Sequence, residues 1–476
     1  MVFSNSVFLF VFLPLVMLGY YLIRQELRNY WILAVSILFY AWDEPSFTII
    51  LITSILINYI GGLLVEKLKF KKLMLFISVV ANLGLLFYYK YFNFAVDMFN
   101  KAFDKNLQFA YVVLPIGISF FTFQGMSYVI DVYRQEVPAQ KNPFKVGTYI
   151  SMFPQLVAGP IVRYKDVAAE IDNRKVDVDD FAYGVQRFII GLFKKIIIAD
   201  SMALIADEIF EMDFANLATS MAWLGIIAYS IQIFFDFAGY SDMAIGLGRM
   251  FGFHFLENFN YPYISKSISE FWRRWHMSLS SFFRDYVYIP LGGNRKRVYL
   301  NVAIVFLLTG IWHGAAVTFI FWGVWHGIFN IAEKIISDIK KKKNIVEKEK
   351  NIVLKFALGL LQHSYTMMVV IIGWVFFRAN GMIDAIDYLK AMFGLHNPGV
   401  MPYNVWLYLD KWIISIMVLA IFMCTPIFKK IYGAVKIKVH ENIIIPIKYL
   451  VLLGALLLCM LQVASNTYSA FIYFQF

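Results

Sequence analysis

Residues 309–327 read TGIWHGAAVTFIFWGVWHG, an apolar stretch that contains two histidines, His313 and His326. The apolar residues on either side extend it far enough to cross a hydrocarbon core of about 30 Å, which predicts membrane-spanning helix. An imidazole at membrane depth costs free energy unless it has a partner or a task, so it indicates a functional site. Residues 271–293, FWRRWHMSLSSFFRDYVYIPLGG, add His276 among aromatic residues and arginines.

The rest of the chain is also apolar. Of its 476 residues, 60% are hydrophobic and 16% are charged, whereas soluble domains carry about 25% charged residues. The composition therefore predicts one all-α integral membrane domain, residues 1–476, with about 12 transmembrane helices. The candidate spans are 7–23, 30–42, 47–64, 73–93, 111–130, 184–206, 219–238, 299–320, 316–333, 354–377, 411–428 and 444–464.

The net charge of +11 does not indicate nucleic-acid binding. Lysine and arginine cluster in short loops between the apolar runs, as expected for the cytoplasmic side of a membrane protein. This pattern predicts that both termini lie outside. Residues 334–351 form the longest polar segment and are predicted to be a solvated cytoplasmic loop. Both cysteines lie in apolar runs, so neither a disulfide framework nor a metal site is expected.

Two segments differ from ordinary spans. Residues 146–160, VGTYISMFPQLVAGP, are apolar but short and contain two prolines and a glycine near their end. They predict either a re-entrant segment that lines a cavity or a short interfacial helix. At about 100° per residue, residues 268–289 predict an amphipathic helix at the membrane surface, with Arg273, His276 and Arg284 on its polar face. Its arginines either anchor the helix or hold a phosphorylated ligand.

His313 is the best candidate for chemistry. The small residues Gly314, Ala315 and Ala316 follow it and would let a slender substrate approach the ring. As a general base, it would deprotonate a hydroxyl group for attack on an acyl thioester. The alternative is a packing residue that bonds to a neighbouring helix. His326 would lie about 220° further round an ideal helix and is interpreted as structural.

Several long segments together resemble one known family. They are LPIGISFFTFQGMSYVIDVYR (114–134), MFPQLVAGPIVRY (152–164), YSIQIFFDFAGYSDMAIGLGRMFGF (229–253), residues 271–293 and TGIWHGAAVTF (309–319). This set is similar to the membrane-bound O-acyltransferases, in the bacterial branch that includes alginate and peptidoglycan O-acetyltransferases and teichoic-acid D-alanyl transferases. The resemblance implies a fold with re-entrant and interfacial helices around a central funnel. In that funnel, a cytoplasmic acyl donor and an extracytoplasmic acceptor meet near an essential histidine.

The resemblance also implies roles for particular residues. The essential histidine maps onto His313 and a second family histidine onto His276, within a catalytic core of about residues 110–380. The implied function is transfer of acetyl groups from acetyl-CoA across the cytoplasmic membrane to a polysaccharide or to a secreted acetyltransferase. No permanently bound cofactor and no metal are implied. Arg273 and Arg284 would bracket the phosphates of the donor.

Two other functions stay open. One is D-alanyl transfer to teichoic acid, although the final span and tail, residues 444–476, are more like the acetyl branch. The other is a transporter or lipid flippase, which the absence of paired carboxylates within the spans disfavours.

The chain ends in FIYFQF, residues 471–476, in which Tyr473 carries the single hydroxyl group. If this tail folds back into the funnel, His313 would activate the phenol, and Tyr473 would relay the acyl group to the acceptor. The alternative is an aromatic residue that lies at the membrane interface.

Overall fold

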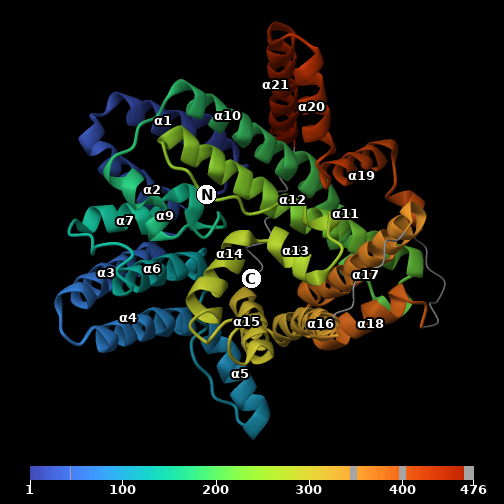
Figure 1. Ribbon diagram of the computed structural model, residues 1–476, viewed down its shortest axis with the longest axis horizontal. Helices are drawn as coiled ribbons and strands as arrows, with labels where there is room; N and C mark the ends of the chain where they lie inside the picture. The colour runs from blue at the N-terminus through green and yellow to red at the C-terminus, as the bar shows by residue number, and fades with distance from the viewer. Residues whose placement is uncertain (43, 344–350, 396–403, 466–476) are drawn as a thin grey trace.

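The computed structural model describes residues 1–42, 44–343, 351–395 and 404–465, which form helices and loops without a β-strand (Figure 1). The all-α prediction is confirmed. The helices are α1 (Leu13–Leu22), α2 (Arg28–Ala41), α3 (Thr48–Lys67), α4 (Lys71–Leu86), α5 (Phe92–Phe103), α6 (Ile118–Tyr133), α7 (Pro143–Ser151), α8 (Phe153–Leu156), α9 (Tyr164–Asp172), α10 (Val178–Phe193), α11 (Asp200–Phe210), α12 (Thr219–Phe251), α13 (Ile268–Arg274), α14 (Met277–Phe283), α15 (Val298–His313), α16 (Val317–Lys342), α17 (Ile352–Arg378), α18 (Met382–Met392), α19 (Lys411–Met423), α20 (Ile427–Lys438) and α21 (Glu441–Ser465).

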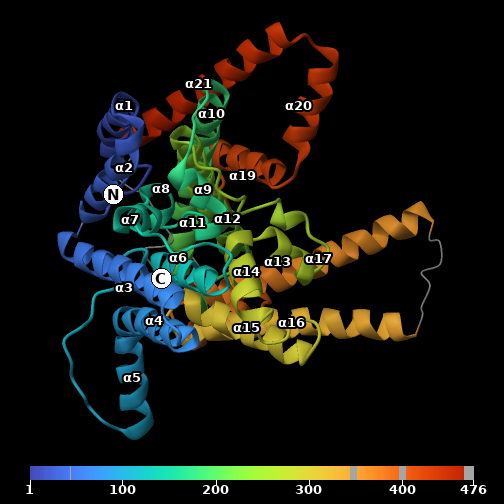
Figure 2. The ribbon, with the colours of Figure 1, turned by 60° about the vertical axis from the view of Figure 1, so that its left-hand side comes forward.

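Within the described residues, five helical stretches are long and apolar enough to cross a membrane, or six if the bent pair α19 and α20 counts as one span. The five are Pro45–Lys67, Lys71–Phe103, Thr219–Phe251, Ile352–Arg378 and Glu441–Ser465. The protein is thus a membrane protein. Counting only helices long enough to span a membrane does not reproduce the predicted number of about 12 transmembrane helices, because several expected spans consist of shorter helices. Helix α20 projects away from the rest, whereas α21 returns to pack against α10; α16 and α17 extend well beyond the centre (Figure 2).

Helix α12 is the central element of the fold. It has 33 residues and is buried along nearly all of its length. Helix α10 packs along it (Figure 1), and the two backbones come close together at two pairs of glycines. A Cβ atom on Gly246 would lie 2.6 Å from the Gly184 carbonyl oxygen, and one on Gly191 would lie 2.6 Å from the Gly239 carbonyl oxygen. Small residues at such crossings let membrane helices approach closely.

We expect Gly246→Val to destabilise this helix pair. The new side chain would meet backbone atoms of α10 that cannot rotate away, and overpacking of this kind costs about 1–3 kcal/mol of unfolding free energy. The measurement is the temperature at which the detergent-solubilised protein loses its monodisperse chromatographic peak. Gly433→Val is the matched control, because nothing lies within 4 Å of a Cβ atom there. Equal melting of the two variants would contradict the prediction.

The segment 146–162 is buried throughout, although it contains only the short helices α7 and α8 and irregular backbone. Gly117, at the start of α6, has φ of +76°, and a Cβ atom on it would lie 2.7 Å from the Leu156 carbonyl oxygen. Irregular backbone at membrane depth is tolerated where protein surrounds it. This burial supports the re-entrant alternative over the interfacial helix.

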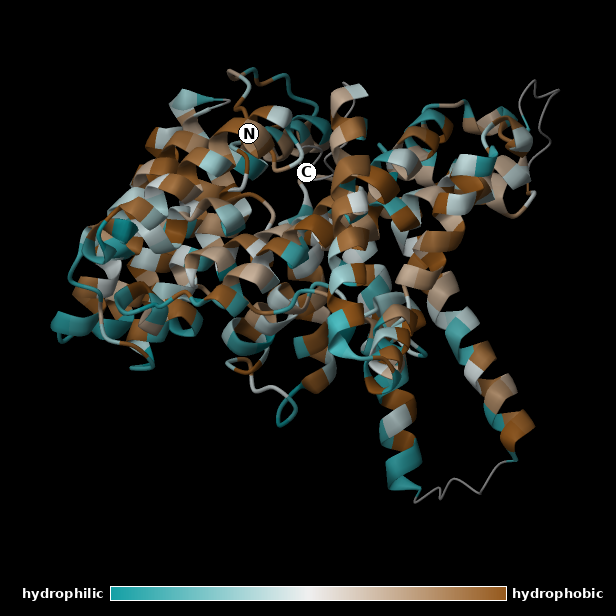
Figure 3. Cartoon of the chain, turned by 90° about the horizontal axis from the view of Figure 1, so that it is seen from above, coloured by the Kyte–Doolittle hydropathy of each residue, from teal (hydrophilic) through white to brown (hydrophobic). Residues whose placement is uncertain are grey.

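Three basic loops that were predicted to share the cytoplasmic side lie together. Gln25 Nε2 donates to the Arg174 carbonyl oxygen at 3.3 Å, and Lys165 pairs with Glu136 at 2.5 Å. Hydrophilic residues gather in such loops and at helix ends, whereas the helices themselves are largely hydrophobic (Figure 3). The shared position of these loops agrees with the predicted orientation.

Candidate active site

The segment around His276 is not one helix. The prediction of a continuous amphipathic helix over residues 268–289 is wrong, because His276 has φ of +44° and separates α13 from α14. The reason is a pairing with residues 258–260. The Asn260 amide donates to the Arg274 carbonyl oxygen at 2.9 Å, and the Met277 amide donates to the Asn258 carbonyl oxygen at 2.9 Å. These bonds replace helical hydrogen bonds at the break.

His276 is fully buried at this break, not on an exposed polar face. Its Nδ1 lies 3.1 Å from Oδ1 of Asn258, which also accepts the backbone N–H of Ser278 at 3.3 Å. Since that oxygen only accepts, Nδ1 carries the proton and Nε2 keeps its lone pair. Nε2 has no hydrogen-bond partner among the described residues. Burial lowers the pKa of His276 to about 3, so the ring is neutral.

His313 is the last residue of α15 and is 6% exposed. Its ring packs edge-on against Trp322 and Phe377, with centroids 5.0 and 5.1 Å away, and its Nε2 has no hydrogen-bond partner among the described residues. A Cβ atom on Gly314 would lie 2.2 Å from the Phe319 ring, so the small residue after the histidine is needed for packing. The rings of His276 and His313 are 6.5 Å apart. The structure thus brings the two predicted catalytic histidines together.

A pocket of about 750 Å³ is lined by residues close in sequence to both histidines, such as Leu279 and Thr309, although neither histidine lines it. Despite the helix break, Arg273 and Arg284 both line it. The wall combines these and other basic residues with an apolar part that reaches Thr309 on α15. Thr309 lies one helical turn before His313, a rise of about 6 Å. The remaining basic and acidic lining residues are Lys266, Lys334, Lys341, Glu333 and Asp338.

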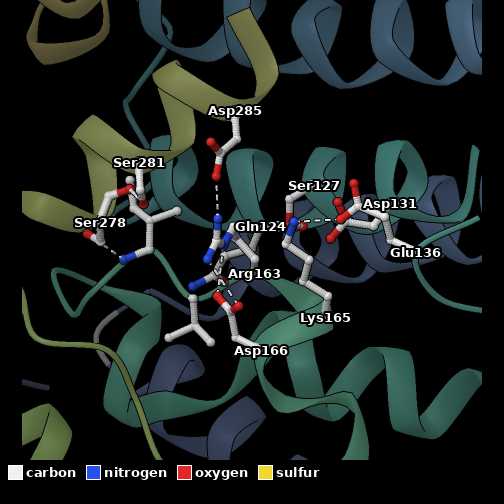
Figure 4. A network of polar contacts seen from close by, with 12 residues as sticks. Gln124, Ser127, Asp131, Glu136, Arg163, Lys165, Asp166, Ser278, Ser281 and Asp285 are labelled. Carbon is white, nitrogen blue, oxygen red and sulfur yellow. Dashed lines mark hydrogen bonds and ion pairs between the residues drawn. The ribbon is translucent and has the colours of Figure 1, made fainter. Parts of the chain in front are cut away.

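A polar network that includes Arg163, Asp285 and Ser278 holds the re-entrant segment in place (Figure 4). Arg284 donates to Asp285 at 2.7 Å, and Arg163 donates to the other oxygen of the same carboxylate at 2.6 Å. Partial burial alone would raise the pKa of Asp285, but the hydrogen bond from Arg284 and the charges of both arginines hold it below its usual range. Ser278 accepts the Ile161 amide at 3.0 Å. The loop after α8 is thereby joined to the segment that carries His276.

A smaller pocket, of about 100 Å³, is lined by His313 itself. Trp312, Ser119, Gly117 and Lys90 also line it. The sequence analysis did not single out Lys90, although a signal was present: it is the one charged residue in the apolar run 73–93. The small pocket adjoins the start of α6, which the charge pattern places towards the outside.

A series of aromatic contacts runs from the lining of one pocket to the lining of the other. Phe283 lines the larger pocket, whereas Trp312 and Phe120 line the smaller one. Between them, Phe123 stacks on Phe282 with centroids 4.3 Å apart and lies 5.8 Å from Trp312. We call Phe123, Phe282, Phe283 and Trp312 the aromatic wall. His313 follows directly after the last member of this wall.

The other predicted residues are placed as follows. His326 is buried against Trp272 and Trp322 and lines neither pocket. Its predicted angle to His313 does not apply, because the helix is interrupted between α15 and α16. Tyr473 lies outside the described residues, so its position stays a prediction. The part of the chain that the structure describes holds no cluster of His, Cys, Asp or Glu arranged to bind a metal ion.

Comparison with known proteins identifies the family. The sequence pattern of MBOAT, the membrane-bound O-acyltransferase family, matches residues 73–372, which include both pockets. The chain belongs to the membrane-bound O-acyltransferase family. The resemblance seen in the sequence is therefore confirmed, and the protein is an O-acyltransferase.

Three relatives show where this O-acyltransferase stands within the family. It is 39% identical, over the full length of both chains, to a Pseudomonas putida protein named "Probable alginate O-acetylase". It is 34% identical to the peptidoglycan O-acetyltransferase of Helicobacter pylori, over 83% of this chain and 80% of that protein. Similarity to the teichoic acid D-alanyltransferase of Bacillus subtilis is 33% over 42% of this chain and 53% of that protein. The O-acetyltransferases thus match far more of the chain.

Proposed function

We propose that this protein is an O-acetyltransferase of the cytoplasmic membrane, which takes acetyl groups from cytoplasmic acetyl-CoA and delivers them to an extracytoplasmic polysaccharide. The observation that carries the proposal is the position of His313, which lines the small pocket and lies one helical turn from Thr309, a lining residue of the large pocket. The relatives named for O-acetylation support acetyl as the transferred group. Residues 110–380 form the proposed catalytic core within a single domain.

The larger pocket suits acetyl-CoA. Its basic residues match a donor that carries phosphate groups, because guanidinium groups bind phosphate through paired, charge-assisted hydrogen bonds. Arg284 is 62% exposed and is oriented by Asp285, so its remaining N–H groups are accessible in the pocket. The apolar inner part, with Leu279 and Phe306, would receive the thin acyl-bearing arm and bring the thioester towards His313.

The chemistry needs only the neutral imidazole. The unprotonated ring nitrogen of His313 takes the proton of the acceptor hydroxyl while the oxygen attacks the thioester carbonyl carbon. The resulting tetrahedral intermediate expels the CoA thiolate as the C–S bond breaks, and the imidazolium returns its proton to that sulfur. His276 acts by orienting groups around this centre, since Asn258 holds its Nδ1 proton. No permanently bound cofactor takes part in these steps.

The acceptor has two forms in this proposal. The attacking hydroxyl belongs to the polysaccharide itself or to a separate secreted acetyltransferase that completes the transfer. Tyr473 is proposed as a relay between donor and acceptor, with His313 as its base. A tyrosine phenol in water has a pKa of about 10, so it needs such assistance to act as a nucleophile near neutral pH.

The proposal is tested with the full-length protein in proteoliposomes. Supplied with acetyl-CoA and an alginate or peptidoglycan oligosaccharide, it is expected to release the CoA thiol and to form base-labile acetate on the sugar. The alternative, D-alanyl transfer, requires a D-alanyl thioester on a carrier protein. Turnover with that donor but none with acetyl-CoA would overturn the proposal.

We expect the double variant Arg273→Gln, Arg284→Gln to raise the KM for acetyl-CoA by at least about tenfold, because hydrogen bonds to charged groups contribute about 1.5–3 kcal/mol each. The kcat should change much less, since the phosphates are remote from the reacting carbon. Thiol release at varied acetyl-CoA concentration gives both constants. Arg274→Gln is the matched control, because Arg274 pairs with Glu270 and does not line the pocket. An unchanged donor KM would leave the two arginines as interfacial anchors.

A further inference from the structure

Lys90 is a charged residue in the apolar helical stretch Lys71–Phe103. It lies in the π-helical turn Phe87–Tyr91, between α4 and α5, and is half-buried. A charge within such a stretch is costly and is retained where it has a partner or a task. π-Helical turns are rare, and those that proteins contain are frequently found at functional sites.

The Lys90 ammonium group bonds to the end of the helix that carries His313. Nζ donates to the Trp312 carbonyl oxygen at 2.6 Å, to the His313 carbonyl oxygen at 3.1 Å and to Ser119 Oγ at 3.1 Å. Three N–H donors thus meet three acceptors. The carbonyl groups at a helix C-terminus carry partial negative charge, which a cation stabilises. Lys90 therefore fixes the last turn of α15 immediately at the histidine.

The same lysine makes one wall of the small pocket electropositive. The amino end of α6, a helix of 16 residues, begins at Ile118 in that wall and adds its partial positive charge. The buried Nε2 of His313 has no hydrogen-bond partner among the described residues, and the histidine lines the pocket. A base beside a positively charged wall suits an alcohol that loses a proton and gains negative charge on oxygen.

We propose that Lys90 is a positioning residue for acyl transfer and that the small pocket receives the attacking hydroxyl group. Lys90 acts through the end of α15, which sets the direction of the His313 ring, and through its charge, which favours negative charge on the oxygen. This inference deepens the proposed function and rests on it. The ligand of the pocket is an alcohol that enters from the extracytoplasmic side.

Tyr91 separates this role from simple capping of the helix. Its hydroxyl donates to the Ile311 carbonyl oxygen at 2.7 Å, one residue before the acceptors of Lys90. Tyr91 therefore also stabilises the end of α15, but it is uncharged and is not among the residues that line the small pocket. If the helix end needed only a hydrogen-bond donor, the loss of either residue would have a similar effect.

The experiment compares Lys90→Met with Tyr91→Phe in the full-length protein, with acetyl-CoA as donor and an alginate or peptidoglycan oligosaccharide as acceptor. We expect Lys90→Met to lower kcat at least tenfold per monodisperse protein, with the KM for acetyl-CoA within twofold of the parent. Tyr91→Phe should keep kcat within about threefold, and Lys90→Arg should recover most of the loss. Lys101→Met, at an exposed site on α5, controls for loss of a lysine from this stretch.

Equal kcat values for Lys90→Met and Tyr91→Phe, or a loss confined to the donor KM, would overturn the inference. If Lys90→Met does not fold, Ser119→Cys tests the pocket instead. A small membrane-impermeant thiol reagent added from outside is expected to abolish turnover of Ser119→Cys and to spare the parent; full activity after complete labelling would overturn the inference. His313→Ala distinguishes failure of this inference from failure of the proposed function, because retained activity in that variant would contradict the proposed function itself.

Discussion

Replacing His313 by alanine is expected to abolish acetylation of the surface polysaccharide while the amount of protein in the membrane stays near that of the parent. General-base catalysis contributes about 10²–10⁴-fold to a rate, and no other described histidine lines the small pocket. The ring makes aromatic contacts but no side-chain hydrogen bond among the described residues, so its removal costs packing and not a polar network. The measurement is acetate released from the polysaccharide by mild base, with the protein quantified in the same membranes.

His276→Ala is the comparison variant, and its effect is expected to be weaker, because that residue orients groups through Asn258. His326→Gln controls for the loss of a buried imidazole away from both pockets. Acetate near the parental amount in the His313→Ala strain would show that the general-base role is wrong.

Tyr473→Phe is expected to stop acetyl transfer if the chain passes the acyl group through its own tail. The substitution keeps the ring and removes only the hydroxyl group, so apolar contacts of the side chain are preserved. A relay also predicts an acetyl adduct on the C-terminal peptide when the protein is quenched during turnover with acetyl-CoA. Mass spectrometry of that peptide and the acetate assay together measure the two effects.

Tyr468→Phe provides a control for the loss of a tyrosine hydroxyl from the same end of the chain. Near-parental acetate release by Tyr473→Phe would instead identify Tyr473 as an aromatic residue of the membrane interface. The same result would leave the direct route, from donor to acceptor through His313, as the mechanism.

The sequence predicted which side chains lie together at the candidate site better than it predicted the backbone that carries them. His313, followed by three small residues in an apolar run, could be recognised because membrane depth makes a polar side chain conspicuous. Arg273 and Arg284 were correctly expected to lie near each other, and they line one pocket. The predicted continuous helix that would carry both arginines is broken at His276.

That break could not be seen locally. Residues 268–289 have a regular helical pattern. The interruption comes from residues 258–260, which form hydrogen bonds with backbone groups of this segment. Lys90 was missed because it is distant in sequence from α15, whose end it caps. Hydrophobic runs show that a segment is apolar, but they do not show where tertiary hydrogen bonds divide it. For the same reason, the predicted spans exceed the long helices of the structure.

The aromatic wall concerns the leakage of protons and ions through this protein in a membrane that maintains ion gradients. An acetyl group has to pass from one aqueous compartment to the other, whereas protons and ions must not follow it. Phe123, stacked on Phe282 and in contact with Trp312, belongs to a series of packed apolar rings that runs from one pocket to the other. Such a barrier denies ions the hydration that they need to cross. Group transfer at the edge of this partition thus lets the cell modify its surface without dissipating its ion gradients.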